Sequence, residues 1–283
     1  MTGIETSNEH ACFGGTVSFH EHDSATCATP MRFSVYTPPQ VAEGPVPVLY
    51  FLAGLTSTEE NFMAKAGAQR TASEHGLMLV APDTSPRGLD LPGEDDEYDF
   101  GSGAGFYIDA TEKPWADHYK MYSYVVEELP SIVEENFPAG SGARGIFGHS
   151  MGGHGALTIA LKNPELYKSV SAFAPICAPT RAPWGEKAFS GYLGGDREAW
   201  RNHDATELVR EHPFEDGRTI LVDQGLADGF LEEQLYPEVF EEACAKAGQR
   251  LDVRRREGYD HNYYFISTFM QDHIEHHARS LVD

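Results

Sequence analysis

The segment GIFGHSMGGHGA, residues 145–156, joins an apolar strand to an alanine-rich helix through a glycine-rich turn around Ser150. Its core, GHSMG, fits the G-x-S-x-G pattern of a nucleophile elbow, in which a serine occupies a sharp turn between a strand and a helix. Such a strained turn needs small neighbours, and Gly148, Gly152 and Gly153 provide them. A glycine-rich turn with an incidental serine is the alternative, but the flanking strand and helix favour the elbow.

Short apolar runs rich in β-branched and aromatic residues occur on both sides of this segment, at 46–54, 77–83, 144–150, 169–175 and 219–225. Such runs are typical of parallel strands buried on both faces. Helical stretches alternate with them at about 59–75, 118–136, 152–163, 231–247 and 262–281, and Pro130 should kink or divide the second. We therefore expect an α/β fold, with a mostly parallel central sheet and helices on both faces.

Two early segments, GTVSFHEH and MRFSVYTPP, alternate like antiparallel strands with one solvated face. No linker-like composition interrupts the chain, so residues 1–283 are expected to form a single domain. The segment 84–117 is long, glycine-rich and acidic, and it contains five aromatic residues. Loops of this length are usually functional or disordered. The aromatics favour a folded excursion near the rim of the active site.

The charge balance is strongly acidic, with 44 acidic and 21 basic residues and a formal net charge of −23. Nucleic acids and anionic membranes attract basic surfaces, so neither is expected as a partner. The N-terminal sequence lacks the basic and apolar regions of a signal peptide, and no apolar stretch is long enough to span a membrane. Four widely spaced cysteines form no CxxC pair, which indicates a reduced, cytoplasmic setting without a zinc site.

A serine hydroxyl becomes a nucleophile when a histidine takes its proton and a carboxylate orients that histidine. In the α/β-hydrolase arrangement the chain order is serine, acid, histidine, with the acid in a loop after a late strand. TILVDQGLADGF offers Asp223, at the end of the strand and expected to bond backbone locally, and Asp228, in the loop beyond. We favour Asp228. His261, in a loop between the strand-like LDVRRREG and the last helix, is the expected base, and the adjacent Asp260 is not its partner.

The remaining histidines have structural interpretations. His273, His276 and His277 have the i, i+3, i+4 spacing of metal ligands, but the polar end of a terminal helix favours a solvated face. His20 and His22 are expected to share one face of an early strand as a surface pair. His149 and His154 are too local to Ser150 to act as its base, so we assign them to local packing or hydrogen bonding.

A tetrahedral intermediate also needs two backbone donors, one after the nucleophile and one from an early strand-to-helix loop. The first is the amide of Met151. The second should come from LAGLTSTEENF, where Gly54 permits a turn that could aim the amide of Leu55 inward. TSTEENF is also typical of an N-terminal helix cap.

Eight segments in order, among them FLAGLTSTEENF, APDTSPRG, GEDDEYDFGSGAGFYIDAT, GHSMGGHGA, DQGLADGFL and GYDHNYYFISTFMQDHIEHHA, resemble the S-formylglutathione hydrolase, or esterase D, family. The resemblance runs from about residue 11 to the C-terminus. It implies an α/β-hydrolase fold, a cofactor-free and often dimeric enzyme, and hydrolysis of S-formylglutathione to glutathione and formate in formaldehyde detoxification. Mapped by motif, the family's triad falls on Ser150, Asp228 and His261, and its oxyanion donors fall on Leu55 and Met151.

Two positions depart from the family pattern. The family usually reads GLTCTEQNF, with a cysteine linked to sensitivity to thiol reagents, where this chain has Ser57. The family's usual tryptophan before DFG is Tyr98 here, which bears on the rim of the acyl pocket. Because the net charge does not attract anionic glutathione, local cations are expected to bind it, and Lys65, Arg87 and Lys113 are the candidates. The alternatives are a general short-chain carboxylesterase and a catalytically inactive binding module on the same fold.

Overall fold

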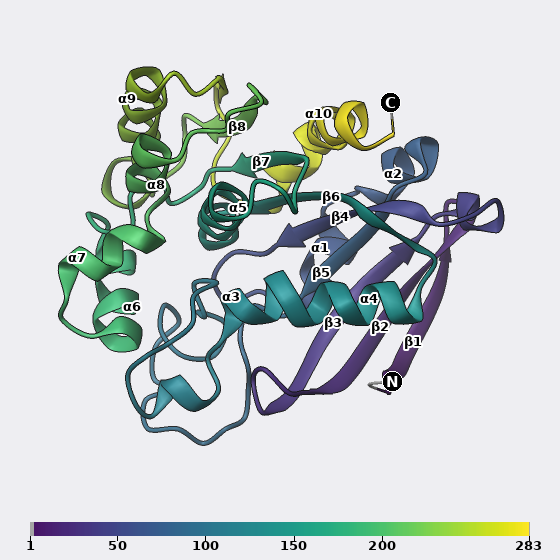
Figure 1. The fold of residues 1–283 in the computed structure, drawn as a ribbon, viewed down its shortest axis with the longest axis horizontal. Coiled ribbons are helices and arrows are strands. Elements are labelled where there is room, and N and C mark those ends of the chain that lie inside the picture. The colour runs from purple at the N-terminus through teal and green to yellow at the C-terminus, as the bar shows by residue number, and fades with distance from the viewer. Residues whose placement is uncertain (1–2, 283) are drawn as a thin grey trace.

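In the computed structural model, which describes residues 3–282, nine strands form one sheet in the order β1-β2-β3-β5-β4-β6-β7-β8-β9 (Figure 1). The strands are β1 (Glu5–Cys12), β2 (Gly15–Ser24), β3 (Thr29–Thr37), β4 (Val46–Leu52), β5 (Met78–Pro82), β6 (Ala139–His149), β7 (Ser169–Phe173), β8 (Ile220–Gly225) and β9 (Leu251–Arg256). Pairing is antiparallel from β1 through β3 to β5 and parallel from β5 through β4 to β9. The predicted mostly parallel sheet with antiparallel N-terminal strands is confirmed.

The edge strand β1 is absent from the sequence-based prediction. Its sequence, ETSNEHAC, is polar, and every residue before Cys12 is exposed, whether its side chain points to one face of the sheet or to the other. Apolar alternation, the signal used for β2 and β3, therefore does not exist in β1. The strand is held by backbone pairing with β2, which a polar segment can form as readily as an apolar one.

Helices cover both faces of the sheet (Figure 1). The described helices are α1 (Glu59–Lys65), α2 (Gln69–His75), α3 (Met121–Ser123), α4 (Leu129–Asn136), α5 (Met151–Lys162), α6 (Pro183–Leu193), α7 (Arg197–Trp200), α8 (Ala205–Glu211), α9 (Pro237–Ala247) and α10 (Tyr263–Leu281). α2 packs against α10 on one face, where α1 also covers strands, whereas α4 and α5 cover the other. Among the helices of residues 3–282, none combines the length and apolar character that a bilayer crossing requires.

Two predicted helices are interrupted in the structure, and a third changes its hydrogen-bonding pattern part-way along. The stretch 59–75 divides at Gly67, which has a left-handed φ of 69°. The stretch 118–136 contains a π-helical turn, η3 (Tyr124–Glu128), directly before α4, where Pro130 lacks the N–H that a regular ladder needs. The disturbance predicted at Pro130 takes the form of a change from π-helical to α-helical hydrogen bonding, while the chain stays helical from Met121 to Asn136. The stretch 231–247 breaks at Tyr236, which has a φ of 53° and precedes Pro237.

The segment 84–117 is folded, as predicted, and its aromatic residues hold it in place. Phe100 stacks on Tyr192 of α6 with ring centroids 4.5 Å apart, and Trp115 meets Phe100 edge-on at 4.9 Å. With α6 and α7, which the sequence analysis did not assign, this segment gathers at the end of the sheet toward which β4 points (Figure 1). The carboxyl ends of the parallel strands therefore meet an ordered wall.

The prediction of a solvated histidine face on α10 is wrong. His273 and His277 are fully buried against β7. His277 Nδ1 lies 2.6 Å from Ser169 Oγ, and its Nε2 lies 2.8 Å from Ser171 Oγ. Because alternate residues of a strand share a face, these two serines of β7 together present hydroxyls to α10. The helix buries its histidines because β7 supplies their partners.

His20 and His22 share one face of β2, as predicted, but they do not form a surface pair. Both side chains are buried, because α4 and the preceding π-helical turn η3 cover this part of the sheet. His22 Nε2 lies 3.0 Å from Tyr124 Oη, and His20 Nε2 lies 2.7 Å from Ser18 Oγ. The antiparallel part of the sheet is therefore covered by a helix on this face.

Acid is expected to destabilise this fold through its buried histidines. Burial lowers the pKa of His20, His154 and His276 to about 4, and lowers the pKa of His273 and His277 as well. Between the ordinary histidine pKa of about 6.5 and about pH 4, the unfolded chain then binds more protons than the folded one. The free energy of unfolding should fall through this window, by up to about 1.4 kcal/mol per pH unit for a fully buried histidine such as His154.

Urea unfolding at about pH 7 and about pH 5, followed by circular dichroism, measures this effect. Two buried acids, Glu59 and Asp204, oppose it, because burial raises the pKa of each. The histidines outnumber them. An unfolding midpoint that stays constant or rises on acidification would contradict the expected result.

Candidate active site

Ser150 occupies the sharp turn between β6 and α5 that the G-x-S-x-G pattern predicts. Its backbone has φ 57° and ψ −118°, a conformation that costs a non-glycine residue about 1–3 kcal/mol. A Cβ at Gly148 or Gly152 would collide with neighbouring backbone, and one at Gly153 would lie 2.8 Å from Pro175 Cβ. The three glycines make room for the turn, which is the geometry of a nucleophile elbow.

The turn is fixed by hydrogen bonds to the last residue of β7 and to the segment that follows it. The Ser150 amide donates to the Phe173 carbonyl at 3.0 Å, and the Ser150 carbonyl accepts from the Ile176 amide at 3.2 Å. Both partners come from the neighbouring parallel strand and its loop, so the sheet itself holds the strained residue in place.

His261 and Asp228 lie together, as predicted, although 33 positions separate them. His261 Nδ1 is 2.5 Å from Asp228 Oδ2. The Phe230 amide donates to Asp228 Oδ1 at 2.8 Å, which orients the carboxylate in the loop after β8. This contact fixes the imidazole so that its Nε2 is the nitrogen left to act on a nucleophile.

Asp223, the alternative acid, has a different role from the predicted one. The predicted bond to local backbone is wrong, because the carboxylate accepts from Arg256 Nε at 3.2 Å and Nη2 at 3.0 Å, across the β8–β9 pair. Its Oδ2 also lies 3.5 Å from His273 Nε2. Asp260 accepts from the Asn262 amide and side chain. Neither carboxylate is the partner of His261.

His149 and His154 do not compete for the role of base. Burial, together with the nearby His261, lowers the pKa of His149 well below its usual value, so its ring stays neutral. It packs against His261 with ring centroids 4.5 Å apart. His154 is buried, with Nε2 3.1 Å from the Phe106 carbonyl. Packing and hydrogen bonding thus account for both, but their partners are distant in sequence.

Ser150 and His261 open into one pocket of about 370 Å³. It is lined by Gly54, Leu55, Thr56, Ser57, Asn61, Lys65, Tyr98, His149, Ser150, Trp184, Phe230, His261, Asn262 and Tyr263. The lining is partly polar, with the loop 54–57 and Asn61, and partly aromatic, with rings from four separate segments. A small acyl group and a polar leaving group both find matching surfaces here.

Both predicted oxyanion donors flank Ser150. A Cβ at Gly54 would lie 3.2 Å from Ser150 Cβ, so the early loop approaches the serine closely. The amide of Leu55 is bonded to no acceptor within residues 3–282. Met151 is the first residue of α5, and the first amides of a helix have no partner in its own ladder. Two amides are therefore available beside the serine.

Only one of the three predicted cations reaches this pocket. Lys65 lines it, with Nζ 5.7 Å from the centroid of the Tyr263 ring. Arg87 lines a different hollow and binds Asp83. Lys113 is exposed and is not among the lining residues. The structure does not support Arg87 or Lys113 as substrate cations.

Three aromatic residues of the pocket were not predicted as site residues. Trp184, Phe230 and Tyr263 come from three separate segments, and their sequence signal is only an aromatic next to a predicted loop. Burial raises the pKa of Tyr263, and the nearby Ser57 side chain opposes part of that rise. Within residues 3–282, no group of three or more His, Cys, Asp or Glu side chains is arranged to hold a metal ion.

Several known proteins are similar to this chain over nearly its whole length. An esterase family model, described as "Putative esterase", matches residues 24–276. The S-formylglutathione hydrolase of Mus musculus is 55% identical over 279 residues, which cover 98% of this chain and 99% of that protein. The S-formylglutathione hydrolase of Paracoccus denitrificans (strain Pd 1222) is 52% identical, covering 98% of each. The chain belongs to the S-formylglutathione hydrolase family.

Membership of this family confirms the predicted α/β-hydrolase fold. A solved structure of an S-formylglutathione hydrolase from Agrobacterium tumefaciens matches with a TM-score of 0.95 and 52% identity, covering 98% of this chain and 99% of that one. The likeness extends over the antiparallel strands as well as the parallel sheet. The structural match therefore extends over nearly the whole chain, as does the resemblance of the sequence segments to this family.

The two departures from the family pattern both lie in the pocket. Ser57 and Tyr98 are among its lining residues, as predicted for positions beside the site and at its rim. Tyr98 accepts a hydrogen bond from Trp184 Nε1 at 3.1 Å. This contact ties the segment 84–117 to the start of α6, so Tyr98 forms part of an ordered rim.

Proposed function

We propose that the chain is a serine thioesterase that hydrolyses S-formylglutathione to glutathione and formate. The observation that carries the mechanism is the pairing of His261 with Asp228 in the pocket that contains the elbow serine. The proposed substrate is supported by the S-formylglutathione hydrolases of Mus musculus and Bos taurus, which are both 55% identical to this chain. The same chemistry would serve in formaldehyde detoxification.

In the first step Ser150 Oγ attacks the formyl carbonyl while His261 Nε2 takes the hydroxyl proton. The amides of Leu55 and Met151 donate to the oxyanion of the tetrahedral intermediate. The C–S bond breaks, and glutathione leaves with the proton from His261. A thiol of pKa about 8.5 is a good leaving group, so this step needs less acid assistance than the departure of an alkoxide.

In the second step water attacks the formyl-enzyme and gives one proton to His261. The ester bond to Ser150 breaks as the proton on His261 passes to Ser150 Oγ, and formic acid leaves and ionises to formate by releasing its own proton to solvent. Asp228 holds the imidazole and stabilises its charged form in both steps. No cofactor takes part in this scheme.

Lys65 is proposed to bind a carboxylate of glutathione. Of the described residues that line the pocket, Lys65 alone is a lysine or arginine, and it makes no ion pair within residues 3–282. Replacing Lys65 with methionine keeps the aliphatic stem and removes the charge. We expect the KM for S-formylglutathione to rise about 3- to 10-fold, with kcat little changed.

The same variant should hydrolyse 4-nitrophenyl acetate with an unchanged KM, because that ester has no carboxylate. Lys113→Met is the matched control, since Lys113 lies outside the pocket. Equal changes in KM for both substrates, or no change for S-formylglutathione, would assign Lys65 another role.

The ratio of kcat/KM for S-formylglutathione to that for an acetate ester tests the proposed substrate. A ratio well above one is expected, whereas a ratio below one would favour a general short-chain carboxylesterase. Labelling of Ser150 by a fluorophosphonate excludes the inactive binding module, and failure to label would revive it.

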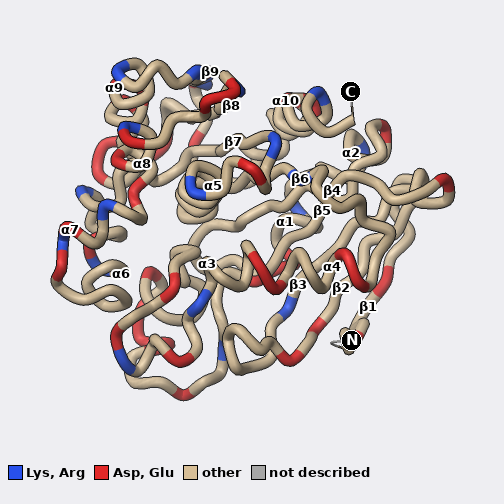
Figure 2. The backbone as a smooth tube through the Cα atoms, viewed as in Figure 1, with Lys and Arg blue, Asp and Glu red and all other residues tan. Residues whose placement is uncertain are grey.

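We also propose a single domain over residues 1–283, a homodimer, and a cytoplasmic location. The family resemblance supports the dimer, and the cysteine pattern supports the compartment. Figure 2 shows acidic residues along the whole chain with Lys and Arg scattered among them. This distribution supports the proposal that neither nucleic acid nor an anionic membrane is a partner.

A further inference from the structure

The loop that carries the Leu55 amide contains a strained residue. Thr56 has φ 68°, a left-handed conformation that is a genuine outlier for a β-branched side chain. Such a conformation persists only where surrounding contacts fix it. The contacts that fix this loop therefore also determine where the Leu55 amide points.

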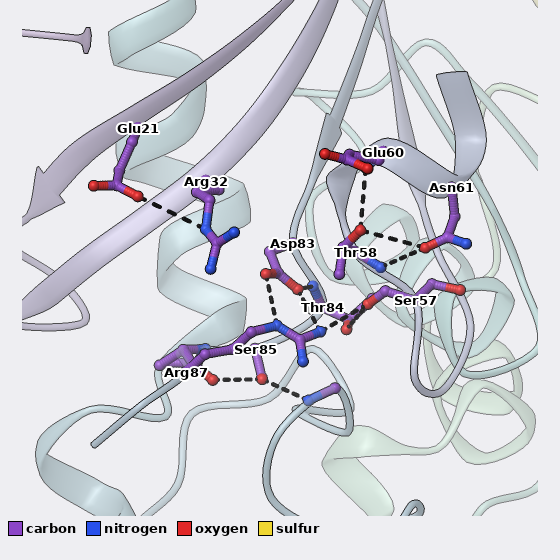
Figure 3. A network of polar contacts seen from close by, with 12 residues as sticks. Glu21, Arg32, Ser57, Thr58, Glu60, Asn61, Asp83, Thr84, Ser85 and Arg87 are labelled. Atoms are coloured by element: carbon purple, nitrogen blue, oxygen red, sulfur yellow. Dashed lines mark hydrogen bonds and ion pairs between the residues drawn. The ribbon is translucent and has the colours of Figure 1, made fainter. Parts of the chain in front are cut away.

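Those contacts come from the residues directly after β5 (Figure 3). The Ser57 carbonyl accepts from Thr84 Oγ1 at 2.6 Å and from Arg87 Nη2 at 3.0 Å. On the other side, the Thr56 amide donates to the Gly103 carbonyl at 2.9 Å, and the Gly103 amide donates to Ser85 Oγ at 2.7 Å. The strained peptide is held from both ends.

Arg87 is itself held by a nearly buried carboxylate. Its Nε donates to Asp83 Oδ2 at 2.8 Å and its Nη2 to Asp83 Oδ1 at 2.9 Å, a two-pronged contact that fixes the plane of the guanidinium. Only 3% of the Asp83 side chain is exposed. With its charge matched by Asp83, Arg87 presents its remaining bonding capacity to the Ser57 carbonyl rather than to a substrate anion.

We propose that Arg87 is a positioning residue of this enzyme. Locked by Asp83, it holds the Ser57 carbonyl and thereby aims the Leu55 amide at the oxyanion that forms on the acyl group attached to Ser150. The inference rests on the proposed serine-hydrolase mechanism. In this proposal Arg87 contributes to transition-state stabilisation by positioning the loop, and it does not bind the substrate.

Arg87→Lys tests the proposal, because lysine keeps a positive charge for Asp83 but cannot bond the carboxylate in two places and also reach Ser57. We expect kcat to fall about tenfold to a hundredfold, while KM stays within about twofold. The loss should be similar for S-formylglutathione and 4-nitrophenyl acetate. The pH profile should keep its midpoint, because the His261–Asp228 pair is not altered.

Arg32→Met is the matched control. Arg32 lines the same hollow as Arg87, but its side chain is half exposed and pairs with Glu21 at 3.7 Å rather than with the loop (Figure 3). Its kinetics should equal those of the unaltered enzyme. Thr84→Val, which removes the second bond to the Ser57 carbonyl without changing charge, should also lower kcat more than KM and decides the matter if Arg87→Lys does not fold.

A tenfold rise in KM with unchanged kcat for Arg87→Lys would overturn the proposal and make Arg87 a substrate cation. Unchanged kcat in both Arg87→Lys and Thr84→Val would overturn it as well. A result that contradicts the proposed substrate can be told apart from one that contradicts the role of Arg87. In that case the unaltered enzyme hydrolyses 4-nitrophenyl acetate but not S-formylglutathione, and the positioning role is still measured on the ester.

Discussion

Ser150→Ala is expected to lower kcat by about a millionfold, because it removes the hydroxyl that attacks the acyl group. Alanine has the same Cβ as serine, so the backbone at φ 57° should be equally strained in the variant and in the unaltered enzyme. The fold and the thermal midpoint should therefore be retained. Steady-state hydrolysis of S-formylglutathione and of 4-nitrophenyl acetate measures the loss.

Fluorophosphonate labelling provides an independent readout for this variant. The unaltered enzyme should be labelled at Ser150, and Ser150→Ala should not be labelled at all. Comparable turnover in the alanine variant would rule out the acyl-enzyme mechanism. Loss of activity in a variant that has also unfolded would not test the mechanism. Circular dichroism shows whether the variant is folded.

Asp228→Asn is expected to lower kcat by about 10⁴-fold with little change in structure. The carboxylate accepts from His261 Nδ1 and from the Phe230 amide, and asparagine can keep the second bond. An amide that donates to Nδ1 would instead select the tautomer in which Nε2 carries the proton. Such an imidazole cannot take the proton of Ser150.

Asp260→Asn is the control, because Asp260 is adjacent to His261 in sequence but bonds Asn262. Its kcat should change by less than about threefold, as for a surface substitution. If Asp260→Asn loses as much activity as Asp228→Asn, or if Asp228→Asn keeps its activity, the assignment of the orienting acid is wrong.

The sequence predicted the parallel strands and the elbow because their signals are local. Buried parallel strands appear as apolar runs, and the elbow requires small residues at fixed offsets from Ser150. His261 and Asp228 could be placed because each follows a predicted strand, and the carboxyl ends of neighbouring parallel strands meet at one edge. Their contact at 2.5 Å agrees with that expectation.

The roles of Arg87 and of the α10 histidines could not be predicted, because they depend on partners that only the fold brings near. Arg87 and Ser57 are 30 positions apart, and His277 bonds serines more than 100 positions away. A lone arginine in a loop and histidines on a polar helix have common solvated interpretations. β1 was missed for another reason, since a strand held by backbone pairing alone has no apolar pattern.

The left-handed backbone at Ser150 limits how this molecule can adapt to heat. Glycine would relax the turn at no steric cost, but it lacks the hydroxyl that attacks the substrate. A lineage under selection for thermal tolerance therefore cannot remove this strain and keep its chemistry. Heat resistance must accumulate at positions remote from the elbow, such as helix caps, exposed loops and the surface, while the turn itself stays as it is.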